Sequence, residues 1–183
     1  MGDGRIIRIL GLDPGLRHTG WGVIDVAGNR LSHVADGTVH TDDRDDLARR
    51  LTTLHEGIRA VIDAWTPDEA AVEETLANKN PASTLKLGMA RGVALLVTAQ
   101  AGLPVDEYLP MLVKKSVVGT GHAEKTQVQH MVKMLLPGFQ TSTADAADAL
   151  AVAICHAHHA ETRRRVAGMT AKVAVRAAAG RRR

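Results

Sequence analysis

The sequence predicts an α/β fold, in which one mixed sheet is flanked by helices. Three observations lead to this prediction. The first forty residues hold three apolar, β-branched segments separated by short turns, a pattern typical of an antiparallel meander. Helical periodicity then alternates with short strand-like segments as far as about residue 162. Aromatic residues make up only 2% of the 183 residues, so the core has to be aliphatic.

Turn signals separate the expected strands. Pro14 and Gly15 end the first strand, and Gly28 and Asn29 end the second. Because short turns join the first three strands, we expect them to be antiparallel neighbours. The strands are expected at residues 5–13, 20–26, 31–41, 70–73 and 104–109.

The helices are expected from apolar spacing and from capping residues. Asp45 or Asp46 can cap the first helix, which stops at Thr66 and Pro67. Ser83 or Thr84 is expected to open the second helix, and Thr143 is a plausible N-cap for the last. The helices are expected to end near residues 66, 100, 118, 136 and 162.

Charge divides the chain into one domain, residues 5–162, and a basic tail, residues 163–183. Residues 161–183 hold eight basic side chains against one Glu, and no apolar period there predicts a core-facing helix, so we expect a mobile tail. Cys155 is the single cysteine, which excludes an intrachain disulfide and favours a reducing compartment. The charged N-terminus does not resemble a signal peptide. We therefore expect a cytoplasmic protein.

Acidic residues stand at the carboxyl ends of two apolar strands. Asp13 ends the first strand beside Pro14, where small residues leave room for a ligand; an Asp that simply starts a turn is the alternative. Glu73 and Glu74 follow the fourth strand, and strand alternation points them in opposite directions. A buried acid is costly unless something pairs with it. Alternation alone does not choose between the two glutamates.

A second pair of carboxylates lies in the last helix. Asp145 and Asp148 are three residues apart and share one helix face. The helix dipole favours Asp145 in the first turn by about 0.3–1 kcal/mol, whereas Asp148 lies beyond that turn in an apolar segment. Two like charges side by side repel each other unless a cation lies between them. This pair is the strongest sign of a functional site that the residues alone give.

A set of four carboxylates without a matching Cys or His set favours a hard cation with oxygen ligands. Mg²⁺ fits better than zinc, and Mn²⁺ can substitute for it. Two such ions per site would activate water and stabilise the leaving oxygen in phosphodiester hydrolysis, provided that the four acids meet in space. His156, His158 and His159 fall on different sides of a helix, so they do not predict a shared metal site.

Basic residues predominate over residues 79–140, with seven Lys and Arg against three acidic residues. Lysine is suited to phosphate contacts, which supply affinity without reading sequence. Lys79, Lys114 and Lys125 lie in or near loops and short elements, which favours a functional role in phosphate contact. For Lys86 and Lys133 a solvated helix face is an equal alternative.

Short stretches between about Ile7 and His158 together form a specific pattern. They are residues 11–15, 19–23, 71–73, 78–80, 85–88, 90–93, 114–119, 121–132 and 144–151. In this order and at this spacing they resemble the RuvC-type Holliday junction resolvases, the crossover junction endodeoxyribonucleases of bacteria. Each stretch alone is weak, and the specificity comes from their combination.

The resemblance implies an RNase H-like fold and a homodimer that cuts two strands of four-way junction DNA with divalent metal. It also implies that the helix with Gly88 and Gly92 contributes to the dimer interface, and it suggests a RuvA–RuvB branch-migration complex as a further partner. Lys114 and Lys125 match basic positions that face DNA near the scissile phosphate. The resemblance, rather than strand alternation, selects Glu73 over Glu74. The metal-binding catalytic acids that it implies are Asp13, Glu73, Asp145 and Asp148.

One departure from the family pattern concerns DNA opening. Where the family commonly places an aromatic residue that unstacks bases, this chain has Leu76, which can wedge between bases but stacks less well. A junction-binding protein with weak or no cleavage is therefore the first alternative. A sugar-kinase or actin-like ATPase is a second, although 183 residues do not supply its two halves. A related nuclease acting on RNA is the third.

Overall fold

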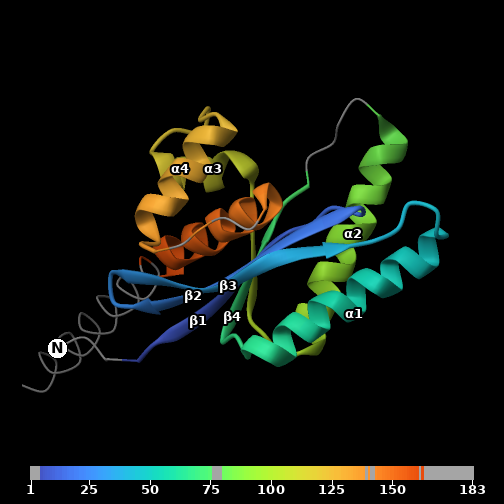
Figure 1. The fold of residues 1–183 in the computed structure, drawn as a ribbon, viewed down its shortest axis with the longest axis horizontal. Helices are drawn as coiled ribbons and strands as arrows, with labels where there is room; N and C mark the ends of the chain where they lie inside the picture. Colours follow the sequence, from blue (N-terminus) through green and yellow to red (C-terminus); the bar gives the residue numbers. More distant parts are fainter. Residues whose placement is uncertain (1–4, 76–79, 139, 141–142, 161, 163–183) are drawn as a thin grey trace, which may run out of the picture.

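The computed structural model describes residues 5–75, 80–138, 140, 143–160 and 162. Five strands form one sheet in the order β3-β2-β1-β4-β5. Helices cover both faces: α1 and α2 lie together on one side of the sheet, and α3, α4 and residues 144–160 lie on the other (Figure 1). The predicted mixed sheet flanked by helices is confirmed.

The sheet combines an antiparallel meander with two parallel strands. β1 pairs antiparallel with β2, β2 pairs antiparallel with β3, β1 pairs parallel with β4, and β4 pairs parallel with β5. The strands are β1 (Ile7–Asp13), β2 (His18–Ala27), β3 (Arg30–His40), β4 (Glu69–Glu73) and β5 (Val105–Tyr108). Each boundary lies within two residues of the predicted one, because the turn signals mark where apolar runs end.

The two faces of the sheet bury separate aliphatic cores. Leu10 and Leu12 of β1 face the side of α1 and α2, whereas Ile9 faces the opposite core, which includes Leu150 and Ile154. This alternation follows from the two-residue period of a strand. β1 is therefore a central strand with apolar side chains on both faces.

Helices α1 (Leu47–Trp65) and α2 (Pro81–Gln100) begin at polar caps. The side chain of Asp46 accepts a hydrogen bond from the backbone N–H of Arg49. Of the two predicted caps, Asp45 and Asp46, it is therefore Asp46 that begins the helix. The expected start of α2 at Ser83 or Thr84 was wrong. Asn80 caps this helix and Pro81 occupies its first turn, where the missing N–H of proline costs nothing.

The opposite layer contains α3 (Pro110–Val118), α4 (Lys125–Leu135) and the helix of residues 144–160. This last helix lies against glycines of β1 and β2. A Cβ atom added at Gly11 or Gly20 would come within 3.0 Å of the helix backbone, and one at Gly22 within 3.0 Å of the Leu150 side chain. The glycines therefore let this helix approach the sheet closely.

None of the described helices is both long and apolar enough to cross a membrane. The tail predicted at residues 163–183 lies outside the described residues.

Candidate active site

Two acidic side chains meet at one edge of the sheet. Asp13 and Glu73 are the last residues of β1 and β4, which run parallel and pair Leu12 with Val72. Since parallel strands end at the same edge, the two acids are neighbours. The sheet topology therefore joins two residues that are sixty positions apart in sequence.

The direction of each side chain follows from strand alternation and the helix layers. Ala71 packs in the core that contains Leu150, so Glu73, two residues later, points to the same face. Glu74 points to the other face, where its charge acts on Arg91 of α2. Glu73 lines the acidic cavity and Glu74 does not. The alternation that sequence alone left open is resolved by which face carries which helix.

The helix of residues 144–160 adds carboxylates to this edge. Its start is fixed by Thr143, whose hydroxyl accepts a hydrogen bond from the backbone N–H of Ala146 and lies 2.8 Å from the Thr38 hydroxyl of β3. Asp148 lines the cavity with Asp13 and Glu73. Asp145 does not line it, but its charge acts on both Asp13 and Asp148.

Two lysines and an apolar wall complete the cavity. Lys114 comes from α3 and Lys125 from α4. The cavity holds about 200 Å³, several times the ~30 Å³ that one water molecule occupies in the liquid. Four residues of the apolar wall were not predicted from sequence. The apolar spacing of their helices was the signal that could have indicated them. They are Pro110, Val113, Val128 and Ala151.

Burial and mutual repulsion raise the pKa values of the three cavity carboxylates. Desolvation, followed by the charges of Asp148 and Asp145, raises the pKa of Asp13 to about 6. Desolvation, followed by the charges of Asp13 and Asp148, raises the pKa of Glu73 to about 8. Burial also raises the pKa of Asp148, although Lys125 opposes this change. Such shifts show that the negative charge at this site is incompletely compensated by the protein.

Lys125 supplies the main compensating charge. Its Nζ lies 2.6 Å from Asp148 Oδ2, and this hydrogen bond raises the pKa of the lysine. Lys125 is the first residue of α4, whose N-terminus is held by a capping box between Glu124 and Gln127. The capped helix start therefore fixes the backbone of Lys125, while its side chain remains half-exposed.

The donor set fits a hard divalent cation. Carboxylate oxygens in a partly buried, electronegative cavity are the ligands that Mg²⁺ and Mn²⁺ prefer. Within the described residues, no three His, Cys, Asp or Glu side chains are close enough to hold an ion as they stand. Lys125 takes up one oxygen of Asp148. A cation would have to draw these side chains inward.

The other predicted site residues differ in placement. Lys114 and Lys125 lie at the cavity, whereas Leu76 and Lys79 lie outside the described residues. His156 contacts Glu69 and Tyr108, whereas His158 contacts Ser116.

Comparison with known proteins gives consistent matches. Residues 9–156 match the family described as crossover junction endodeoxyribonuclease RuvC. A protein of that name from Paramagnetospirillum magneticum is 66% identical over 91% of this chain and all of its own length. Another from Rhodospirillum rubrum is 66% identical over 84% of this chain and 90% of its own.

Solved structures agree in fold. Thermus thermophilus RuvC in complex with Holliday junction substrate superposes with a TM-score of 0.79 at 32% identity, covering 85% of this chain and 96% of the other. The yeast mitochondrial Holliday junction resolvase Ydc2 has a TM-score of 0.61 at 12% identity, covering 86% of this chain and 82% of its own, which is a likeness of fold alone. The architecture is the RNase H-like fold that was expected.

Proposed function

This chain belongs to the RuvC family of crossover junction endodeoxyribonucleases, and on that premise we propose that it resolves Holliday junctions by paired, symmetric nicks in DNA. The observation that carries the proposal is one cavity that Asp13, Glu73 and Asp148 line together with two lysines. A protein that only binds junctions has no need of partly buried carboxylates with raised pKa values, which cost stability. The cleaving enzyme is therefore favoured over the binding protein.

We infer that Asp13, Glu73, Asp145 and Asp148 are the catalytic acids and hold divalent metal. All four lie at or beside one sheet edge, and their oxygens suit Mg²⁺, with Mn²⁺ as a substitute and two ions per site. When bound, the ions activate water and stabilise the leaving oxygen. The chain's own task is to hold four oxygen donors in place on rigid elements.

The proton on Glu73 belongs to this proposal. With a pKa of about 8, Glu73 carries a proton at neutral pH when no cation is bound. A cation held by this carboxylate would lower its pKa and would displace the proton. Lys125 has the complementary role: its ammonium neutralises Asp148, and its half-exposed side chain could also contact a phosphate.

DNA contacts follow from the basic residues around the cavity. Lys114 and Lys125 flank the carboxylates from two helices, so a phosphate entering between them would meet positive charge on both sides. We also assign DNA-binding roles to Lys79, as a phosphate contact, and to Leu76, as a wedge between bases. These two contacts depend on the family resemblance.

A homodimer would supply two active sites for two nicks, because a twofold axis matches the symmetry of a four-way junction. The outer face of α2 suits such an interface. A Cβ atom added at Gly88 or Gly92 would meet nothing within 4 Å in this chain, and Leu85, Met89 and Leu96 beside them are exposed. A cytoplasmic location and a RuvA–RuvB partner complex complete the proposal.

The test is cleavage of a mobile synthetic four-way DNA junction with Mg²⁺, alongside linear duplex of the same sequences and an RNA junction. We expect paired nicks on the DNA junction alone, and loss of at least about 10³-fold of the rate in Asp13→Asn and Asp148→Asn while junction binding is retained. Asp63→Asn, which removes a surface carboxylate of α1, is the matched control. Tight binding without nicks in the unaltered protein, even with Mn²⁺, would favour the binding-only alternative.

A further inference from the structure

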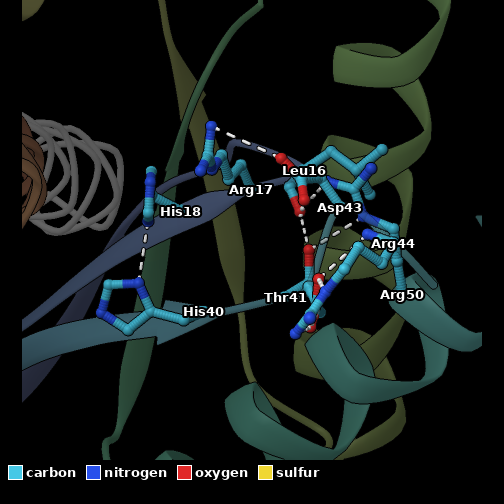
Figure 2. A network of polar contacts seen from close by, with 9 residues as sticks. Leu16, Arg17, His18, His40, Thr41, Asp43, Arg44 and Arg50 are labelled. Carbon is cyan, nitrogen blue, oxygen red and sulfur yellow. Dashed lines mark hydrogen bonds and ion pairs between the residues drawn. The ribbon is translucent and has the colours of Figure 1, made fainter.

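Two histidines that do not line the carboxylate cavity face each other across adjacent strands of the meander. His18 begins β2 and His40 ends β3, and the two residues are direct partners in the antiparallel register. Their Nδ1 atoms lie 2.8 Å apart and their rings meet edge to face, with centroids separated by 4.9 Å. Figure 2 shows the two rings pointing toward each other, and both residues are exposed.

From this pair we propose a second metal site, in which His18 and His40 chelate a borderline transition-metal ion such as Zn²⁺, Ni²⁺ or Cu²⁺. Imidazole nitrogen suits these ions and does not suit Mg²⁺. Metal–nitrogen bonds of about 2.0–2.1 Å at 90–109° place two ligand nitrogens roughly 2.9–3.4 Å apart. The observed separation of 2.8 Å therefore needs to widen by only a few tenths of an ångström.

The strand ends that carry the pair are fixed by their own hydrogen bonds. The Thr41 backbone N–H donates to the Arg17 carbonyl at 3.1 Å, and the Thr41 hydroxyl donates to the Leu16 carbonyl. Arg50 donates to the Thr41 hydroxyl, as Figure 2 shows. Because these bonds hold the two strand ends together without the metal, the ion gains two preplaced ligands at little cost in chain ordering.

The remaining ligands are expected to be water. Nearby carboxylates are engaged by arginines, Asp43 with Arg17 and Asp42 with Arg44. Among the described residues no third His, Cys, Asp or Glu completes a cluster around the pair. Two imidazoles and open coordination positions give an exchangeable site, and they do not give a closed structural one.

The site would act on the turn that follows Asp13. Thr19, next to His18, donates from its hydroxyl to the Gly15 carbonyl at 2.7 Å and accepts from the Gly15 N–H at 3.2 Å. An ion that joins His18 to His40 would hold the start of β2 and, through Thr19, the turn of residues 14–17. A transition metal bound to this pair would therefore stiffen the turn that directly follows Asp13.

The experiment uses the full chain, stripped of metal, with one equivalent of Cu²⁺ at about pH 8, where imidazole is largely neutral. Electron paramagnetic resonance counts the nitrogen ligands, and titration gives the affinity. We expect two nitrogen ligands in the unaltered protein. His18→Gln and His40→Gln should each bind Cu²⁺ at least about tenfold more weakly, because each variant loses the chelate. Ni²⁺ at ten times its dissociation constant should raise Tm by about 3–5 °C in the unaltered protein alone.

Matched controls separate this site from other metal ligands. His55→Gln removes a histidine of α1 that contacts Gln100, and it should bind Cu²⁺ like the unaltered protein. Mg²⁺-dependent cleavage should survive in His18→Gln, because the carboxylate cavity is intact. Equal Cu²⁺ affinity and nitrogen count in the unaltered protein, His18→Gln and His40→Gln would overturn the proposal.

Discussion

The two ends of the helix of residues 144–160 both bury charged or polar groups, but they treat them differently. At its start, Asp148 lies among carboxylates whose pKa values are raised, with Lys125 as its ion-pair partner. Near its end, His156 is only 2% exposed and is held at 2.8 Å by Glu69 Oε2 and at 3.0 Å by the Tyr108 hydroxyl. The satisfied end locks the helix to β4 and β5, whereas the start holds excess negative charge that a cation would relieve.

Stabilising polar groups and functional ones thus differ in how completely their partners satisfy them. A buried polar group with good partners on both sides contributes to a unique packing arrangement. A cluster of like charges costs free energy in the folded state and is retained where a ligand uses it.

The largest effect is expected from Lys125→Met at the functional end. Loss of the ammonium removes charge beside the phosphate, so the single-turnover cleavage rate should fall by about 10²-fold or more. Lys133→Met alters an exposed lysine on the same helix and should cleave normally. A cleavage rate within threefold of the unaltered protein would show that Lys125 only balances Asp148.

His156→Phe should break the structural end of the helix. The substitution leaves Glu69 and the Tyr108 hydroxyl without this partner, at a cost of about 2 kcal/mol, or roughly 4–8 °C in Tm. Cleavage measured well below the new Tm should change little, because the residue lies two turns from Asp148. Thermal unfolding by circular dichroism gives the shift.

The control for this prediction is His158→Phe, two residues along the same helix at an exposed position. We expect its Tm to stay within about 1 °C of the unaltered protein. If His156→Phe also left Tm unchanged, the hydrogen bonds to Glu69 and Tyr108 would not be what holds the C-terminal end of this helix.

A smaller effect of opposite sign is expected from Glu73→Gln without metal. The pKa of Glu73 rises from 4.5 to about 8 on folding, so the folded state binds its proton more tightly than the unfolded state. The resulting stability is present below about pH 4.5 and is lost as the pH rises toward 8. Removing the charge should therefore raise Tm at about pH 8 by roughly 2–6 °C, and by less at about pH 5.

The neighbouring substitution Glu74→Gln tests the direction of this argument, since Glu74 faces Arg91 on the other side of the sheet. Its Tm difference from the unaltered protein should not grow between pH 5 and pH 8. A pH-dependent gain in Glu74→Gln, and none in Glu73→Gln, would contradict the assignment of the buried acid. Cleavage should be lost in Glu73→Gln and retained in Glu74→Gln.

Most of the fold could be predicted from local signals. Pro14 and Gly15 end β1 because proline and glycine fit a turn better than a strand, and Asp46 begins α1 because its side chain satisfies a free N–H. The start of α2 was misplaced because Ser83, Thr84 and Asn80 are all good caps. Pro81 at the first turn was the signal that favours Asn80.

The candidate site could be predicted only in part. Asp13, Asp145 and Asp148 stood out because an acid in an apolar segment needs a reason. Glu73 was selected by family resemblance, and strand alternation could not have chosen it without knowing which helices cover which face. The His18–His40 pair gave no sequence signal, because twenty-two positions separate two ordinary surface histidines.

Strand ends, most helix caps and the supply of carboxylates follow from local sequence, because each depends on a few neighbouring residues. Which of these groups meet depends on the packing of the whole chain. Lys125 and Asp148, His156 and Glu69, and the Nδ1 atoms of His18 and His40 are paired by strand order, by register and by how closely a helix approaches Gly11 and Gly20. These distances are set by packing of the whole chain, since ion pairs and hydrogen bonds act over only a few ångströms.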